Sequence, residues 1–124
     1  MKRIMLAVFI LFASQVAAHE MTPTYPKLRP SHIDNVYVTE MEMFNKRQDV
    51  EFYEIGVFDK DMNPIPFVSK YNVINLKYLG HVTFDVYVRK ADVSRATYLC
   101  SISKLRKDGS TKAAVASKIC SKFR

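Results

Sequence analysis

Two cysteines near the end of the chain constrain its fold more than any other feature. Cys100 and Cys120 are the only cysteines, and each lies in a strand-like run. The runs, Tyr98 to Ser103 and Ala113 to Cys120, flank a polar segment that contains Asp108-Gly109-Ser110-Thr111. Asp-Gly is a strong turn signal between two strands, so the end of the chain reads as a β-hairpin.

A hairpin that pairs Cys100 with Cys120 has its centre near Ser110, within that turn. The centre falls slightly beyond a two-residue Asp108-Gly109 turn, so we expect a longer loop or a bulge. Cross-strand neighbours have Cβ atoms close enough for a disulfide. We therefore predict a Cys100–Cys120 disulfide, with two free thiols or a metal pair as the alternatives.

Residues 1–18 have the form of a cleaved secretory signal peptide. Lys2 and Arg3 precede an apolar run from Ile4 to Ala13, and Val16-Ala17-Ala18 matches a cleavage site. The apolar run is too short to span a bilayer comfortably, so we expect no membrane span after cleavage behind Ala18. The mature chain would then be periplasmic or secreted, in an oxidising compartment that favours the disulfide.

Short runs of β-branched and aromatic residues recur through residues 19–124, without a long amphipathic helix. The run His81 to Arg89 alternates most regularly, as a half-buried strand does. In Val36 to Phe44 the apolar parity changes before Met41, so we expect a bulge or a change of face, with a helix over Glu40 to Phe44 as the alternative.

The remaining candidate strands are Val50 to Phe58 and Tyr71 to Leu76, and Lys90 to Arg95 is a connection with a possible helical turn. Met21 to Ser31 holds three prolines, so it can only be extended or an edge strand. About seven short strands at this spacing predict one all-β domain over residues 19–124, an immunoglobulin-like antiparallel sandwich.

The chain is basic, particularly near its end. The net charge is +7, and removal of Lys2 and Arg3 leaves +5. A basic strand edge could attract an acidic partner, or its lysines could simply discourage strand pairing. No nucleic-acid-binding module is recognisable, so we do not expect nucleic acid as a partner.

The three histidines offer one alternative chemistry. Cleavage after Ala18 would make His19 the new N-terminus, and its amine and ring nitrogen together could bind copper, with His81 or His32 as a second ligand.

No arrangement of nucleophile and base is visible, so we do not expect an enzyme. Apart from this copper alternative, we expect no cofactor.

The order of these features resembles the N-terminal domain of the periplasmic pilus-assembly chaperones, the PapD-like family. The resemblance covers most of residues 21–104. It lies in a proline-containing first strand, a valine-rich strand that ends in Phe44-Asn45, and the hairpin turn Val57 to Ile65. It continues in Leu76 to Gly80 before the alternating strand, and in Arg95 to Cys100.

The resemblance implies a fold and a way of binding. Some members join their last two strands, F and G, by a disulfide, which Cys100 and Cys120 would reproduce. Members hold the carboxylate of a bound subunit with an Arg on the first strand and a Lys on the last. The positional candidates implied here are Lys27 or Arg29, and Lys112 or Lys118.

Our main functional hypothesis is an exported, non-enzymatic protein-binding or chaperone-like assembly module. It would pair with another protein chain, possibly a surface or envelope subunit, through an exposed strand edge. That edge is either Lys112 to Cys120 or the proline-rich first strand. The candidate binding residues are Lys27, Arg29, Lys112, Val115, Ser117 and Ile119. The alternatives are a structural or accessory component of an envelope or virion, and a copper-binding protein that uses His19.

Overall fold

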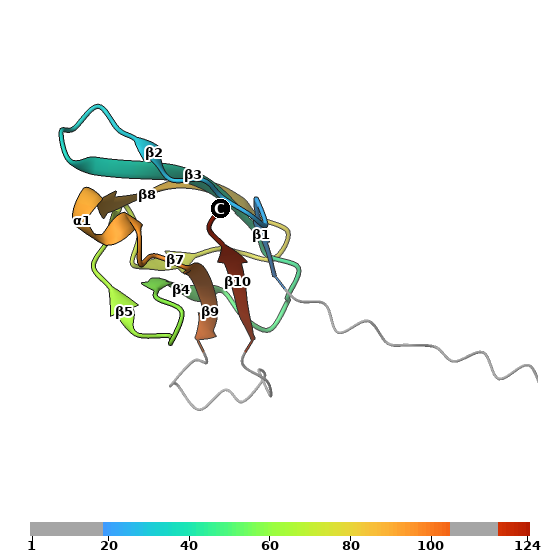
Figure 1. The fold of residues 1–124 in the computed structure, drawn as a ribbon. Helices are drawn as coiled ribbons and strands as arrows, with labels where there is room; N and C mark the ends of the chain where they lie inside the picture. The colour runs from blue at the N-terminus through green and yellow to red at the C-terminus, as the bar shows by residue number, and fades with distance from the viewer. Residues whose placement is uncertain (1–18, 105–116) are drawn as a thin grey trace, which may run out of the picture.

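Two antiparallel sheets stack face to face in the computed structural model, which describes residues 19–104 and 117–124 (Figure 1). One sheet, sheet A, has the strand order β1-β3-β8-β6, and β2 also pairs with β3. The other, sheet B, has the order β10-β9-β4-β5, and β7 also pairs with β4. In chain order the elements are β1 (Glu20–Thr22), β2 (Arg29–Pro30), β3 (Val36–Phe44), β4 (Phe52–Phe58), β5 (Pro64–Ile65), β6 (Val68–Ser69), β7 (Val73–Asn75), β8 (His81–Arg89), α1 (Lys90–Val93), β9 (Tyr98–Lys104) and β10 (Lys118–Lys122).

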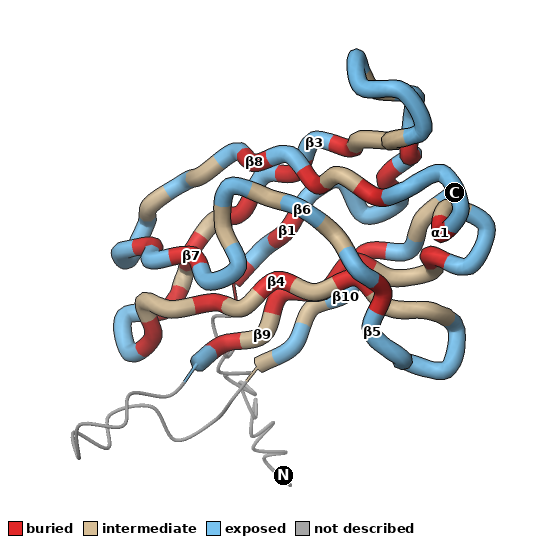
Figure 2. Tube along the Cα trace, turned by 90° about the vertical axis from the view of Figure 1, so that its left-hand side faces the viewer, coloured by how far each residue is buried: buried red, intermediate tan, exposed pale blue. Residues whose placement is uncertain are grey.

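The core lies between the sheets, where alternate side chains of each strand meet. Figure 2 shows buried and exposed residues alternating along the strands. Sheet A contributes Met41 and Met43 from β3 and Val86 from β8, while Tyr53 of β4 and Leu99 of β9 come from sheet B; each is at most 1 % exposed. The antiparallel, immunoglobulin-like sandwich predicted from the strand pattern is therefore confirmed.

Strand β3 corrects one detail of the sequence prediction. It pairs with β8 without interruption from Val36 opposite Arg89 to Phe44 opposite His81. The expected bulge or change of face is therefore wrong, and so is the alternative helix. Odd-numbered side chains face the core throughout the strand, and Thr39, which is 7 % exposed, occupies the inward position where the apolar pattern breaks.

The predicted hairpin of the two cysteines is confirmed where the structure describes it. Cys120 lies directly opposite Cys100 in the β9–β10 ladder, and their sulfur atoms form a disulfide of 2.04 Å. The described residues contain no free cysteine. The turn Asp108-Gly109-Ser110-Thr111, and with it the predicted longer loop, lies outside the described residues.

The proline-rich first strand divides its pairing between the two sheets. β1 pairs with one end of β3, and β2 pairs with the other end at Val38 and Tyr37. Between them, the Thr24 and Pro26 carbonyls accept hydrogen bonds from residues at the end of the chain. The predicted edge position is therefore correct.

In the described part of the chain, no helix is long and apolar enough to cross a membrane.

Candidate functional site

The outer edge of β10 is the candidate site, because half of its backbone groups face away from sheet B. The backbone groups of odd-numbered residues in β10, and of the residues that flank it, bond to β9 or to the loop before β9. At the two ends of this ladder, Ser103 N–H donates to the Ser117 carbonyl, and Phe123 N–H donates to the Thr97 carbonyl. Successive peptide groups of a strand point in opposite directions. The N–H and C=O groups of Lys118 and Cys120 therefore point outward, and no hydrogen bond from the described residues covers them.

The first strand closes the far end of this edge. Lys122 N–H donates to the Thr24 carbonyl at 3.0 Å, and Arg124 N–H donates to the Pro26 carbonyl at 3.0 Å. The open part of the edge, as far as the structure describes it, therefore ends at Cys120. A strand added to β10 can therefore pair with Lys118 and Cys120 but not with Lys122, whose N–H is bonded to Thr24.

The disulfide holds this edge to β9. Cys100 and Cys120 face each other with Cα atoms 4.1 Å apart, in a pair without mutual backbone hydrogen bonds. Such pairs bring side chains closest together in an antiparallel ladder. Their side chains share the outer face of sheet B with Gly56, Phe58 and Lys118. The free edge is thus covalently fixed to the strand behind it.

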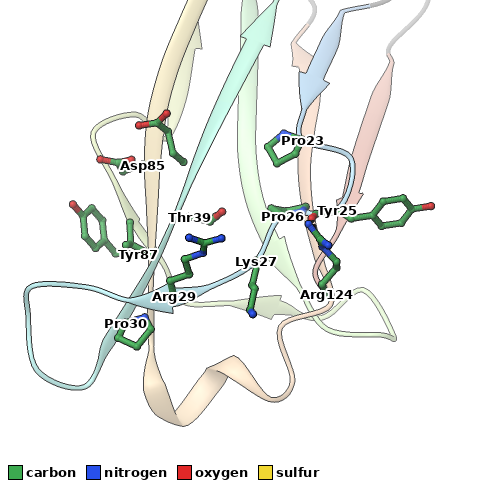
Figure 3. Close-up of a pocket in the computed structure, with 12 residues that line it drawn as sticks. Pro23, Tyr25, Pro26, Lys27, Arg29, Pro30, Thr39, Asp85, Tyr87 and Arg124 are labelled. Atoms are coloured by element: carbon green, nitrogen blue, oxygen red, sulfur yellow. Dashed lines mark hydrogen bonds between the residues drawn. The ribbon is translucent and has the colours of Figure 1, made fainter.

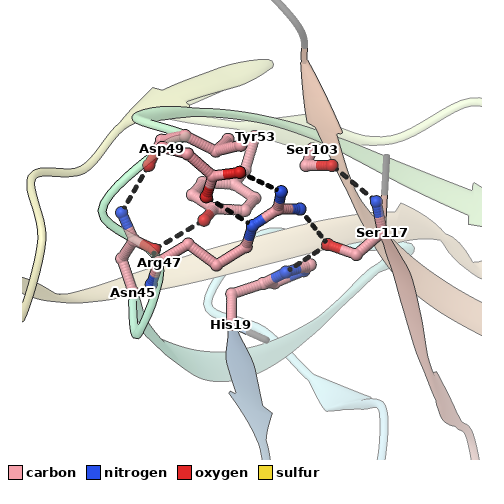
Figure 4. Close-up of polar contacts among 8 residues, drawn as sticks. His19, Asn45, Arg47, Asp49, Tyr53, Ser103 and Ser117 are labelled. Carbon is pink, nitrogen blue, oxygen red and sulfur yellow. Dashed lines mark hydrogen bonds and ion pairs between the residues drawn. The ribbon is translucent and has the colours of Figure 1, made fainter. Parts of the chain in front are cut away.

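A buried polar cluster fixes the start of β10 from inside the sandwich (Figure 4). His19 is 1 % exposed, and its Nε2 lies 2.7 Å from the Ser101 hydroxyl. Its Nδ1 lies 3.2 Å from the hydroxyl of Ser117, which also accepts a 3.3 Å hydrogen bond from Arg47 Nη1. The His19 ring also packs against Tyr53, with 4.4 Å between ring centroids. The cluster therefore connects the first strand to both strands of the disulfide hairpin.

The hydrogen bonds of this cluster suit a neutral imidazole. Because Arg47 donates to the Ser117 oxygen, the Ser117 hydroxyl can donate to Nδ1 of His19, and Nε2–H can then donate to Ser101. Burial, helped by the positive charge of Arg47, lowers the pKa of His19 to about 4. Asp49 accepts two hydrogen bonds from the Arg47 guanidinium, which lowers the pKa of its carboxyl.

Asn45 extends the cluster and uses its whole side-chain amide. It is fully buried, and its amide nitrogen donates to the carbonyls of Val50 and Leu76 at 2.8 Å each. Its amide oxygen accepts from the Tyr53 hydroxyl at 2.6 Å and from Arg47 N–H at 2.9 Å. Burial raises the pKa of Tyr53 to about 12, so this hydroxyl stays a donor. Asn45 thereby joins the loop after β3 to β4 and to the segment after β7.

The predicted binding residues on the last strand divide into two groups. Ser117 and Ile119 are described, and both point inward: Ser117 into the polar cluster and Ile119 against the core. Lys112 and Val115 lie outside the described residues. Lys118, which the family resemblance implied as a carboxylate-holding candidate, shares the outer face with the disulfide, as does Lys122, and both are exposed. Its binding role stays a prediction.

The predicted residues on the first strand line a separate cavity of about 550 Å³ (Figure 3). Lys27 and Arg29 are both exposed there, and their side chains leave the strand in different directions. Arg124 lines the same cavity, and its Nε donates to the Tyr25 carbonyl at 3.1 Å. The structure thus brings Lys27 and Arg29 together with the basic end of the chain, beside the closed end of β10.

The structure separates the histidines of the copper alternative. His19 faces the core, with both ring nitrogens within hydrogen-bonding distance of serine hydroxyls. His81 lies on the outer face of sheet A, stacked on Phe44 at 4.2 Å and 3.2 Å from the Glu42 carboxylate. His32 lies near Tyr87, with ring centroids 6.5 Å apart. The described residues include no cluster of three or more metal-ligating side chains, and copper binding by His19 stays a prediction.

Sequence reasoning missed most of the polar cluster. Asn45, Arg47 and Asp49 lie between the strands predicted over Val36 to Phe44 and Val50 to Phe58, where no site was predicted, and Tyr53 lies within the second of these strands. One signal pointed to Asn45, since the strand that ends in Phe44-Asn45 was part of the family resemblance. The contacts themselves join residues far apart in the chain, which a linear pattern does not reveal.

Comparison with known proteins supports the fold and nothing finer. No protein-family model matches the sequence, and no curated protein matches it. Among solved structures, the chain is similar to the E. coli chaperone DraB, with a TM-score of 0.61 and 12 % sequence identity. The match covers 86 % of this chain and 53 % of the DraB chain, so this chain spans about half the length of that chaperone. The fold is therefore chaperone-like.

Proposed function

We propose that the mature chain is an exported, non-enzymatic module that binds another protein through the outer edge of β10, in the manner of an assembly chaperone. One observation carries the proposal: Lys118 and Cys120 present backbone groups that no hydrogen bond within residues 19–104 and 117–124 pairs, on a strand that a disulfide fixes to its neighbour. Backbone hydrogen bonds to an added strand supply affinity, and a rigid edge reduces the ordering cost of binding.

Two further features support export and a protein partner. Residues 1–18 carry the pattern of a signal peptide, and the disulfide suits an oxidising compartment such as the periplasm or the exterior. The fold is shared with a chaperone. The expected partner is a surface or envelope subunit. Mass spectrometry of the exported protein tests the first feature: it should begin at His19, and a chain that keeps Met1 would contradict export by cleavage.

A proline on the edge tests the binding mode. Lys118→Pro removes an outward N–H and adds a ring at the edge, while every hydrogen bond between β10 and β9 remains. Lys118→Ala keeps the N–H and removes the side chain beyond Cβ together with its charge. Thr83→Pro places a proline on β8, in sheet A, as a matched control. Each tagged variant is produced in the source cells, checked for the disulfide and for cooperative melting, and its co-purified partner is quantified.

We expect Lys118→Pro to lower partner recovery at least about tenfold, because one hydrogen bond is lost and the ring obstructs the added strand. Thr83→Pro should recover the same partner in full. Lys118→Ala should lower recovery less than Lys118→Pro does, because its backbone N–H remains. Undiminished recovery of that partner by folded Lys118→Pro would overturn binding through the β10 edge.

A further inference from the structure

The side chains along the open edge carry only positive charge where the structure describes them. Lys118, Cys120 and Lys122 point to the outer face of sheet B, and all three are exposed. The Lys118 ammonium lies 5.3 Å above the ring of Phe58, and Lys122 forms no ion pair within the described residues. Among the described strand residues of this face, the acidic one is Glu54, and its carboxylate is paired with Lys104.

We propose that the partner segment added to β10 has the pattern acidic–apolar–acidic. This inference rests on the proposed function and specifies the chemistry of its partner. Cross-strand neighbours point to the same face of a sheet. The partner residues opposite Lys118 and Cys120 therefore lie on the outer face, and the residue between them, opposite Ile119, faces the interior.

The two outer positions both meet lysines. A partner side chain opposite Lys118 is its direct cross-strand neighbour. A partner side chain opposite Cys120 is a diagonal neighbour of both Lys118 and Lys122, within reach of long side chains. Carboxylates at these two positions would neutralise the charge of Lys118 and Lys122, whereas lysines there would be repelled by it.

The inner position calls for an apolar side chain. Ile119 is partly buried and packs against the core, and Met21 of the neighbouring strand β1 is 5 % exposed. A partner side chain opposite Ile119 would extend this apolar surface. The Lys122 N–H already donates to the Thr24 carbonyl, so the backbone pairing between the partner segment and β10 ends beside Cys120.

The same lysines explain how an open edge can be selective. Charged side chains on an edge discourage pairing with arbitrary strands. A partner with carboxylates at the facing positions is attracted by the lysines. Their charge therefore favours an acidic strand over a neutral or a basic one. Selectivity by charge should weaken as salt screens the exposed pairs.

Three capped heptapeptides test the inference directly, with valine alternating with glutamate, threonine or lysine. Each is titrated into the folded, disulfide-intact protein, and binding is followed by exchange protection of the Lys118 and Cys120 amides. We expect the glutamate peptide to bind about tenfold more tightly than the threonine peptide, from two opposite-charge pairs. The lysine peptide should give no protection, and about 0.5 M sodium chloride should remove most of the difference.

Charge reversal supplies the matched controls. The double variant Lys118→Glu/Lys122→Glu should reverse the ranking and favour the lysine peptide. Lys77→Glu/Lys90→Glu makes the same change in net charge at exposed positions away from β10 and should keep the wild-type ranking.

The outcomes separate this inference from the proposed function. Equal protection by all three peptides would overturn acidic selectivity and leave edge pairing intact. No protection by any peptide would overturn the inference and count against edge pairing as well. Binding of the glutamate peptide without protection of Lys118 and Cys120 would show attraction to a basic surface only, and would also overturn it.

Discussion

The Ser117 hydroxyl oxygen lies 3.2 Å from Nδ1 of His19, although the two residues are 98 positions apart in the sequence. Ser117 immediately precedes the edge strand β10, and His19 immediately follows the predicted cleavage site. This contact joins residue 19, where the chain would begin after the predicted cleavage, to the beginning of the candidate binding edge. Substitutions at His19 should therefore also weaken the attachment of β10.

Replacing His19 by phenylalanine tests that connection. The ring volume is roughly kept, but the hydroxyls of Ser101 and Ser117 lose their shared partner inside the sandwich. Leaving buried polar groups unsatisfied should lower the free energy of unfolding by about 2–4 kcal/mol in chemical denaturation. His32→Phe, at an exposed position, should change it by less than about 0.5 kcal/mol. Equal effects of the two variants would contradict the role of the cluster.

The same histidine predicts how stability depends on pH. The pKa of His19 is about 4 in the folded protein and about 6.5 when unfolded, so between these values the unfolded chain binds more protons. The free energy of unfolding should therefore rise with pH from about 4 to 6.5, by about 3 kcal/mol in total. Asp49 has a lowered pKa, so its contribution is lost at more acidic pH, starting near its ordinary value of 3.8.

Denaturation measured at a series of pH values checks this dependence. The slope between pH 4 and 6.5 should largely disappear in His19→Phe, because the group that titrates is gone. It should persist in His81→Gln, which changes a side chain on the outer face of sheet A and leaves His19 with its two hydroxyl partners in place. A slope that survives in His19→Phe would mean that another group causes it.

Removing the disulfide should weaken both the fold and the edge. Cys100→Ala/Cys120→Ala opens a loop with a sequence separation of 20, which should cost roughly 3 kcal/mol in the free energy of unfolding. Partner recovery should also fall, because an unconstrained β10 must be ordered on binding. Reducing agent should destabilise the wild type by a similar amount and leave the double variant unchanged. A wild type that is insensitive to reduction would show that the bridge contributes little.

Asn45→Asp tests whether the buried amide is needed as such. The variant keeps the shape, but a carboxylate cannot donate to the carbonyls of Val50 and Leu76. It should cost at least about 3 kcal/mol in the free energy of unfolding, similar to Asn45→Ala, because two buried acceptors are left unpaired. Asp34→Asn, at an exposed position, is the control. Near-wild-type stability of Asn45→Asp at neutral pH would contradict the need for the two hydrogen bonds that the Asn45 amide donates.

Local patterns in the sequence predicted the parts of the fold that depend on local physics. The alternation from His81 to Arg89 matches β8 residue by residue, because a sheet buried on one face imposes a period of two. The hairpin pairing of Cys100 with Cys120 follows from the turn residues between them. The prolines of the first strand correctly excluded a helix and placed it at an edge.

The errors and omissions come from tertiary contacts. In β3 the sequence pattern breaks because Thr39 faces inward, while Val38 lies on the outer face opposite Tyr87, where it is partly shielded. Nothing in the sequence brings His19 to Ser101, since that contact depends on how the two sheets stack. The binding roles predicted for Ser117 and Ile119 stay predictions. Their side chains point inward, while the outward backbone groups of this strand belong to Lys118 and Cys120.

Amide exchange at Lys118 and Cys120, measured in the free protein and in complex with its captured partner, tests the central claim most directly. In the free protein both amides should exchange quickly, while the amides of Ile119 and Ser121, which face β9, should be protected. In the complex the Lys118 and Cys120 amides should slow by at least about tenfold, because each gains a backbone hydrogen bond. Unchanged exchange at both residues in a saturated complex would contradict binding through the β10 edge.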